Sequence, residues 1–160
     1  NCTFFDNYAQ ATGAAGAGGI YNTYASPTVV NSILWGDRYG AGSREMYNTN
    51  SSAPSISYSD VEGGCGNIGS AVCGDDNASD NPVFVDSITT DGDGYDLHLQ
   101  ESSPCIDVAF NDAVPSDVAD LDDDSDTTEQ LPYDLADETR VADGPDGDTT
   151  ATVDMGAYEY

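Results

Sequence analysis

Three segments of the chain repeat one short pattern at intervals of about 27 to 30 residues, and this repeat constrains the fold more than any other feature. Each segment opens with Asn or Tyr and reaches a large apolar side chain at its fourth position. The three segments are Asn1–Asn7, Asn31–Asp37 and Tyr58–Gly64. A fixed period in this range is typical of a solenoid, in which each repeat unit buries its apolar side chains against the next unit.

The composition of each repeat unit favours strands over helices. Short runs rich in Val, Ile, Tyr, Phe and Thr alternate with Gly, Pro, Asn and Ser, which is the pattern of strands joined by turns. The segments that precede the second and third units also match, Ile20–Thr23 with Met46–Thr49 and Ser26–Val30 with Ala53–Ser57. Superposing the units predicts two inward-facing columns, two positions apart along a strand: Cys2, Ser32 and Ser59, and Phe4, Leu34 and Val61.

Three later motifs add a family resemblance: Pro82–Asp86, Leu97–Asp107 and Thr152–Tyr160. Together with the repeats they resemble the closing segment of secreted bacterial right-handed parallel β-helix proteins. The resemblance implies an all-β fold, a right-handed parallel β-helix, with an extracellular or cell-surface location in a bacterium. It also implies an organisation in three parts, with β-helix coils in residues 1–64, final coils with a Cys loop in 65–106, and an acidic C-terminal cap in 107–160.

The charge of the chain excludes two classes of partner. Asp and Glu number 30 against 3 Lys and Arg, so the formal net charge is −27. Nucleic acids and anionic membrane surfaces are bound mainly through Lys and Arg, and we expect neither as a partner. We also expect no membrane insertion, because no apolar run approaches the length of a transmembrane helix. The acidic surface attracts cations, either as a solvated surface in high salt or as specific Ca²⁺ sites.

Ca²⁺ sites are predicted where carboxylates alternate with glycines around tight turns, since this cation prefers several oxygen ligands. Three acidic runs offer this chemistry: Asp91–Asp96, Asp120–Asp126 and Asp143–Asp148. For each run, a solvated surface loop is the alternative. We expect the Ca²⁺ sites in the first and last runs, with these ligands: Asp91, Asp93 and Asp96, and Asp143, Asp146 and Asp148.

Cys65 and Cys73 flank a short Gly-rich loop that can bring their sulfur atoms together. In a secreted protein this spacing predicts a disulfide, with two free thiols as the alternative.

We do not expect a catalytic site within the 160 residues of this sequence. Polysaccharide lyases with a parallel β-helix need a basic residue and cations that hold a uronate, and this chain contains no Lys. Glycosidases use paired carboxylates, but this chain has so many Asp and Glu residues that the sequence identifies no particular pair as catalytic.

We therefore expect a non-catalytic extracellular structural or surface protein, adhesin-like or fibre-forming. Asn1 enters midway through a repeat unit, so either further units precede it or another copy docks there, which would build a head-to-tail filament. The alternative is a carbohydrate-active or carbohydrate-binding β-helix with its site on upstream coils. The expected partners are accordingly other copies of the chain or extracellular polysaccharide.

Overall fold

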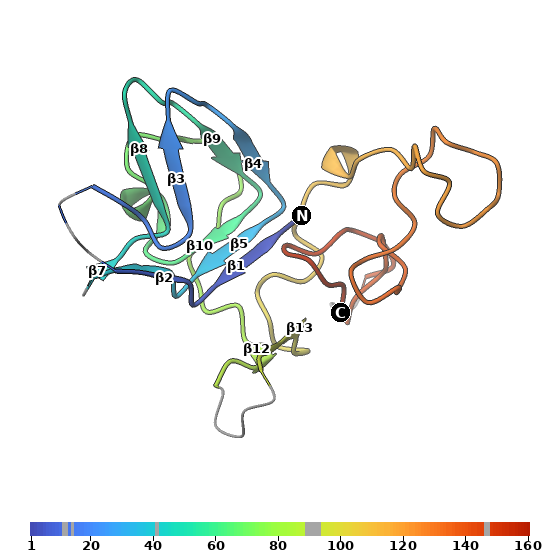
Figure 1. The fold of residues 1–160 in the computed structure, drawn as a ribbon. Coiled ribbons are helices and arrows are strands. Elements are labelled where there is room, and N and C mark those ends of the chain that lie inside the picture. Colours follow the sequence, from blue (N-terminus) through green and yellow to red (C-terminus); the bar gives the residue numbers. More distant parts are fainter. Residues whose placement is uncertain (11–12, 14, 41, 89–93, 146–147) are drawn as a thin grey trace.

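The structure is a computed structural model that describes all residues except 11–12, 14, 41, 89–93 and 146–147. Nearly all of its regular elements are strands of two to four residues (Figure 1). The strands are β1 (Thr3–Phe5), β2 (Tyr8–Ala9), β3 (Ile20–Thr23), β4 (Thr28–Val30), β5 (Ile33–Trp35), β6 (Arg38–Tyr39), β7 (Gly42–Ser43), β8 (Met46–Thr49), β9 (Ser55–Ser57), β10 (Asp60–Val61), β11 (Val72–Cys73), β12 (Phe84–Asp86) and β13 (Asp96–Leu99). The described residues also contain two 3₁₀ turns, η1 (Gly64–Asn67) and η2 (Asn111–Ala113).

Parallel pairing joins the three repeat units in the predicted register. β5 lies between β1 and β10, and Leu34 is opposite both Phe4 and Val61. β3 pairs with β8, and β9 lies between β4 and β11, all in parallel. The predicted column of Phe4, Leu34 and Val61 is therefore confirmed.

The prediction of a right-handed parallel β-helix is wrong. The described strands belong to five separate sheets of two or three strands, and no continuous solenoid runs through the described residues. The pairs β6 with β7 and β12 with β13 are antiparallel.

The physical reason lies in the length of the repeat. The repeated pattern ends near Gly64, and beyond it only β11 and the bridge between Asp60 and Ala78 still pair in parallel with the units, whereas β12 and β13 pair with each other in antiparallel fashion.

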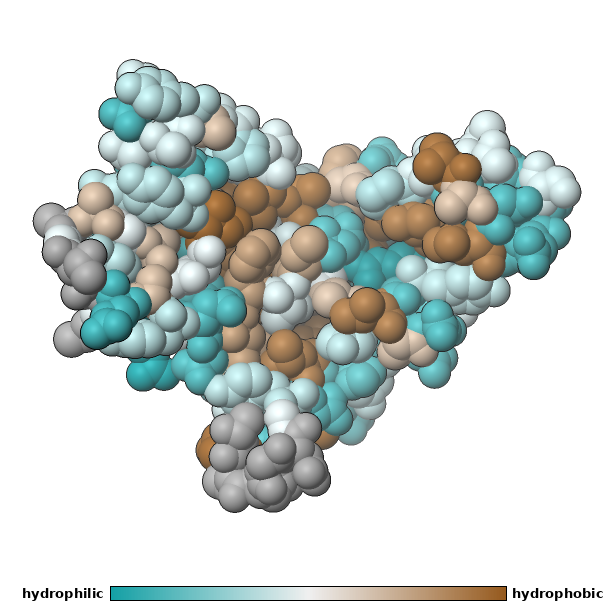
Figure 2. Space-filling model, viewed as in Figure 1, coloured by the Kyte–Doolittle hydropathy of each residue, from teal (hydrophilic) through white to brown (hydrophobic). Residues whose placement is uncertain are grey.

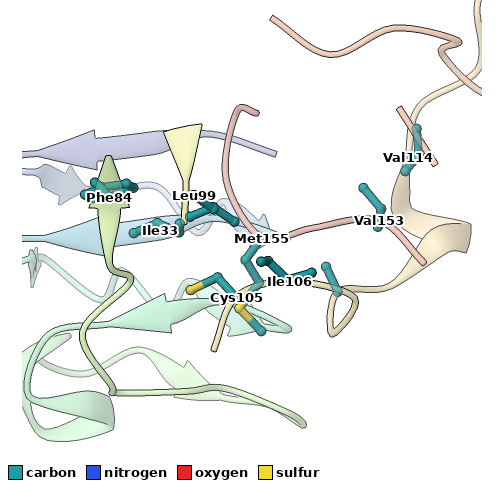
Figure 3. Packing of buried hydrophobic residues seen from close by; sticks show 9 residues of the cluster. Ile33, Phe84, Leu99, Cys105, Ile106, Val114, Val153 and Met155 are labelled. Atoms are coloured by element: carbon teal, nitrogen blue, oxygen red, sulfur yellow. The ribbon is translucent and has the colours of Figure 1, made fainter. Parts of the chain in front are cut away.

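Two apolar clusters meet at β5, because successive side chains of a strand point to opposite faces. Leu34 belongs to the cluster inside the repeat units, together with Met46, Ile56, Val61 and Ile68. Ile33 belongs to a second cluster, which Figure 3 shows between β5 and the C-terminal residues. Its other buried members are Phe84, Leu99, Cys105, Ile106, Ala109, Val114, Val153 and Met155. The C-terminal segment, residues 107–160, thus packs against the outer face of the first sheet.

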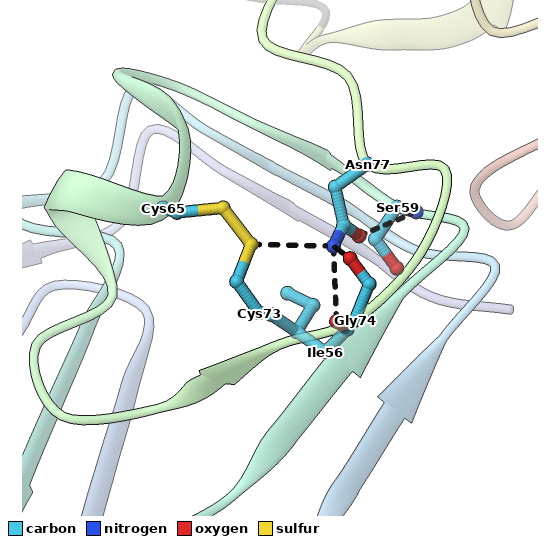
Figure 4. Close-up of a disulfide and its surroundings, with 6 residues drawn as sticks. All are labelled: Ile56, Ser59, Cys65, Cys73, Gly74 and Asn77. Carbon is cyan, nitrogen blue, oxygen red and sulfur yellow. Dashed lines mark hydrogen bonds between the residues drawn. A yellow bond between two sulfur atoms is a disulfide. The ribbon is translucent and has the colours of Figure 1, made fainter.

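The predicted disulfide between Cys65 and Cys73 is present, with 5.9 Å between the Cα atoms (Figure 4). Asn77 holds the adjoining turn, since its side-chain amide donates to the carbonyl oxygens of Ile56 at 3.0 Å and Gly74 at 3.1 Å. The disulfide loop therefore closes the end of the repeat units opposite to β1.

Candidate metal centre

Loop 117–129 carries the clusters of side chains best arranged for a metal ion among the described residues. It is the orange loop that extends from the C-terminal segment in Figure 1. Its base is closed by an antiparallel bridge between Ser116 and Gln130, and the Asp117 amide donates to the Glu129 carbonyl oxygen at 2.8 Å. The bridge therefore places Asp117 and Glu129, which are twelve positions apart in the sequence, side by side at the two ends of the loop.

Within the loop, the chain turns tightly because Asp residues accept the left-handed backbone conformation more readily than most residues. Asp120 has a φ of 53° and Asp123 a φ of 60°. Carboxylates also accept hydrogen bonds from nearby backbone amides, as is usual in Asp-rich turns. The donor and acceptor pairs are Ser125 to Asp120, Asp124 to Asp122, and Asp126 to Asp124.

Two groups of three carboxylates result, and Asp122 belongs to both. The first group contains Asp117, Asp122 and Glu129, and the second contains Asp120, Asp122 and Asp124. In each group one oxygen from every residue lies within 4.8 Å of the others. The negative charges of these carboxylates repel one another at this separation, and a bound cation would offset the repulsion by attracting each of them.

Asp117 gives the clearest sign that the loop is built for a ligand. Its side chain is fully buried, and burial of a carboxylate is costly unless the charge is paired. One oxygen, Oδ2, accepts a hydrogen bond from the Leu121 amide at 2.6 Å. The other, Oδ1, is buried and has no hydrogen-bond partner among the described residues. A metal ion coordinated by Asp122 and Glu129 would satisfy this oxygen.

Glu129 repeats the feature on the opposite side of the loop. Its Oε1 is buried and has no hydrogen-bond partner within the described part of the chain. Desolvation raises the pKa of Glu129, and the charges of Asp124 and Asp122 raise it further. A set of oxygen ligands without nitrogen or sulfur suits a hard cation. These acidic groups can therefore hold a metal ion.

The two runs predicted as metal sites are only partly described. Asp91, Asp93 and Asp146 lie outside the described residues. Asp96 accepts a hydrogen bond from the ring of His98 at 2.6 Å, which lowers the pKa of its carboxyl group. Asp143 and Asp148 are exposed, and the Thr150 amide donates to Asp148 at 2.6 Å. The described members of these runs form no group of three ligands, and both sites stay predictions.

Sequence reasoning named the run Asp120–Asp126 but missed the two residues that frame it. Asp117 and Glu129 lie outside the alternation of carboxylates, and only the bridge at the base brings them to Asp122. The only signal in the sequence was the strand-like segment Leu131–Leu135 after the acidic run, because Asn111–Ser116 before it has the composition of a turn.

Apart from the metal loop, a hollow lies beside the sheet of β1, β5 and β10, where β1 and β5 end. Its volume is about 270 Å³, and Phe5 and Trp35 line it together with Asp6, Arg38 and Glu62. Arg38 and Asp6 form an ion pair at 2.9 Å across its rim. The hollow combines aromatic rings with charged groups at a solvent-exposed position.

In the described part of the chain, no helix has the length and hydropathy required to cross a bilayer. Comparison of the chain with protein-family models, with curated proteins and with solved structures found no match.

Proposed function

We propose that this chain is a non-catalytic extracellular structural or surface protein whose acidic loop 117–129 binds Ca²⁺ and stabilises the C-terminal segment. The buried Oδ1 of Asp117, which has no hydrogen-bond partner among the residues that the structure describes, is the observation that carries the metal part of the proposal. An isolated buried carboxylate would destabilise the folded state, whereas the same group becomes stabilising once a cation is bound.

The ligand set favours Ca²⁺ over Mg²⁺. Each of the two groups offers three carboxylates, Asp117, Asp122 and Glu129 or Asp120, Asp122 and Asp124, whereas Mg²⁺ usually binds through one or two carboxylates and retains several waters in a strict octahedron. Ca²⁺ accepts six to eight oxygens in a flexible geometry, which suits ligands from an irregular loop.

The disulfide supports an extracellular location, because disulfides persist in oxidising compartments and are rare in the cytosol. The buried acidic residues outside the loop are also engaged in structural contacts. Asp134, for example, accepts hydrogen bonds from the amides of Ala136, Glu138 and Glu159. Such groups stabilise turns, which is consistent with a structural role.

Thermal unfolding in Ca²⁺ and in a chelator tests the metal site. At a free Ca²⁺ concentration about one hundred times the Kd, we expect the free energy of unfolding to rise by about 2.7 kcal/mol. For a chain of this size, the midpoint should then rise by about 5 to 10 °C. Ionic strength is matched with NaCl, and Mg²⁺ is run in parallel with a smaller expected shift.

The variant Asp117→Asn should lose most of the Ca²⁺-dependent shift, measured as the difference between the two conditions within the same variant. Asp112→Asn is the matched control, because Asp112 is exposed and lies outside the loop. An equal shift in both variants, or no shift in the unmodified chain, would remove Ca²⁺ from the proposal.

A carbohydrate-binding role is the second candidate, and the hollow beside Trp35 favours it. Aromatic rings next to charged hydrogen-bonding groups are suited to a sugar ring, which has an apolar face and a polar edge. Trp35 is the only Trp in the chain, so its fluorescence reports on this hollow directly. Titration with cellohexaose should change the emission, and Arg38→Gln should weaken the effect while Arg44→Gln should not. Unchanged emission at millimolar sugar would exclude this candidate for neutral glucans.

A further inference from the structure

Three triplets of the chain have the Asn-x-Ser/Thr pattern that accepts an N-linked glycan, and they begin at Asn1, Asn50 and Asn77. Such triplets are common by chance, so the surroundings of each Asn in the fold decide whether it can carry a sugar. A glycan replaces one of the two hydrogen atoms on the side-chain nitrogen, Nδ2. The folded protein must therefore leave one of these hydrogens free.

Asn77 has no free hydrogen on its Nδ2. This atom donates to the carbonyl oxygen of Ile56 at 3.0 Å and to that of Gly74 at 3.1 Å (Figure 4). Its Oδ1 accepts a hydrogen bond from the Ser59 amide at 3.1 Å. A glycan would break at least one of these bonds. The side chain of Asn1 is also enclosed, because both of its polar atoms are buried.

Asn50 lies at the exposed tip of the turn between β8 and β9. The Ser52 amide closes this turn by donating to the Thr49 carbonyl oxygen at 3.1 Å. Asn50 has a φ of 52°, a left-handed conformation that Asn adopts more readily than most residues. Its Nδ2 donates to Thr23 Oγ1 at 2.9 Å, and this is its only hydrogen bond within the described part of the chain. The second hydrogen is available, and a glycan in its place keeps the contact with Thr23.

The segments around Asn50 carry no charged side chain, although the net charge of the chain is −27. Residues 19–30, 46–57 and 64–74 contain no Asp, Glu, Lys, Arg or His. Parallel pairing brings these segments side by side, through β3 with β8 and through β4, β9 and β11. In Figure 2 the residues at the upper left, where β3, β4, β8 and β9 lie in Figure 1, are mostly pale, as Ser, Thr and Tyr are.

This uncharged surface suits a covering sugar. A sugar that lies over carboxylates removes water from them, which costs free energy, whereas Ser and Thr hydroxyls can exchange water for hydrogen bonds with the sugar. Tyr24 follows Thr23 in the chain and is 84% exposed. Its ring offers an apolar face beside Asn50, and the ring of a sugar can pack against such a face.

We propose that Asn50 is an N-glycosylation site that receives a neutral oligosaccharide during export. The proposal rests on the extracellular location proposed above but not on the metal site. In the reaction, Nδ2 of Asn50 forms a bond to the anomeric carbon of a lipid-linked oligosaccharide and loses one proton. The bond between that carbon and the phosphate oxygen of the lipid breaks, and the lipid phosphate leaves with the electron pair.

Ser52 places the transfer before folding. It is 5% exposed, and its hydroxyl accepts a hydrogen bond from the Ala25 amide at 3.1 Å. The triplet pattern requires this hydroxyl, which a transferase cannot reach once the turn has closed. The sugar is therefore added to the unfolded chain, and folding then leaves it on the solvent side of Asn50.

The test is expression of the chain behind a cleavable export signal in a yeast that glycosylates secreted proteins. The folded protein from the medium should exceed its sequence mass by one glycan. Release of the glycan with peptide N-glycosidase in H₂¹⁸O should convert Asn50, and no other Asn, to ¹⁸O-labelled Asp. Asn50→Asp should abolish the added mass, because Asp also accepts the left-handed turn but has no acceptor nitrogen.

Ser52→Thr is the matched control, because it keeps both the triplet and the hydroxyl that accepts from Ala25. Its glycan should remain. Secreted, folded protein without a glycan on Asn50 overturns the proposal, and so does a glycan on Asn77 in the folded protein. Free thiols at Cys65 and Cys73 in the secreted protein would instead contradict the extracellular role, whatever the state of Asn50. The Ca²⁺-dependent change in melting temperature should be equal in Asn50→Asp and in the unmodified chain, which separates this result from the metal site.

Discussion

At the scale of single residues, buried carboxyl groups distinguish this chain from an ordinary acidic surface. Asp37 and Glu45 are fully buried, and the Asp37 amide donates to Glu45 Oε2 at 3.3 Å. Burial raises the pKa of Glu45 to about 9, and the neighbouring carboxyl groups of Asp37 and Glu62 contribute to the shift. Glu45 therefore carries a proton at neutral pH in the folded chain, which allows a compact group of acids inside the repeat units.

Glu45 makes stability depend on pH. In the unfolded chain its pKa returns to 4.5, so unfolding releases a proton between pH 4.5 and about 9. The contribution of Glu45 to stability is complete below pH 4.5 and is lost as the pH rises through 9, by at most about 1.4 kcal/mol per pH unit. Glu45→Gln should flatten this dependence in urea unfolding measured from pH 5 to 9.

Glu101→Gln serves as the control for Glu45→Gln, because Glu101 is exposed. It should leave the pH dependence unchanged. A residual slope is expected in both variants, since burial also raises the pKa of Asp60 to about 7 and that of Asp154 to about 6. Equal slopes in Glu45→Gln and in the unmodified chain would show that Glu45 does not keep its proton in the folded state.

At the scale of elements, the C-terminal segment is held by one buried cation. Arg140 is 4% exposed, pairs with Glu159 at 3.3 Å, and donates to the carbonyl oxygens of Gly156 and Ala157. Burial raises the pKa of Glu159 to about 8, so the contacts of Arg140 with carbonyl oxygens matter as well as its pairing with this carboxyl group. Arg140→Met should lower the free energy of unfolding by about 3 to 5 kcal/mol, because it leaves the buried Glu159 carboxyl group and the two carbonyl oxygens without their donor. Denaturant unfolding measures the effect.

Arg38→Met is the matched control for Arg140→Met, since Arg38 forms an exposed ion pair with Asp6. Exposed pairs contribute little, so the loss should stay below about 1 kcal/mol. Comparable losses in the two variants would contradict the role given to Arg140. The sequence showed Arg140 as one of three cations, but nothing in its spacing from Glu159 indicated that the two would meet inside the protein.

At the scale of the whole molecule, the sequence predicted contacts within the repeat and failed beyond it. The register of Phe4, Leu34 and Val61 was predictable because identical positions of a repeat meet the same surroundings. The separate sheets and the antiparallel pair of β12 and β13 were not predictable, because they involve segments without a repeated pattern. The candidate metal loop was found only in part, since Asp117 reaches Glu129 through tertiary pairing.

The position of Ile33 and Leu34 on opposite faces of β5 ties the two halves of the molecule together. Because β5 contributes a side chain to both apolar clusters, the unfolding of either cluster would expose the other cluster to water. Melting should consequently proceed in a single cooperative step, with the acidic half and the repetitive half losing their structure at the same temperature.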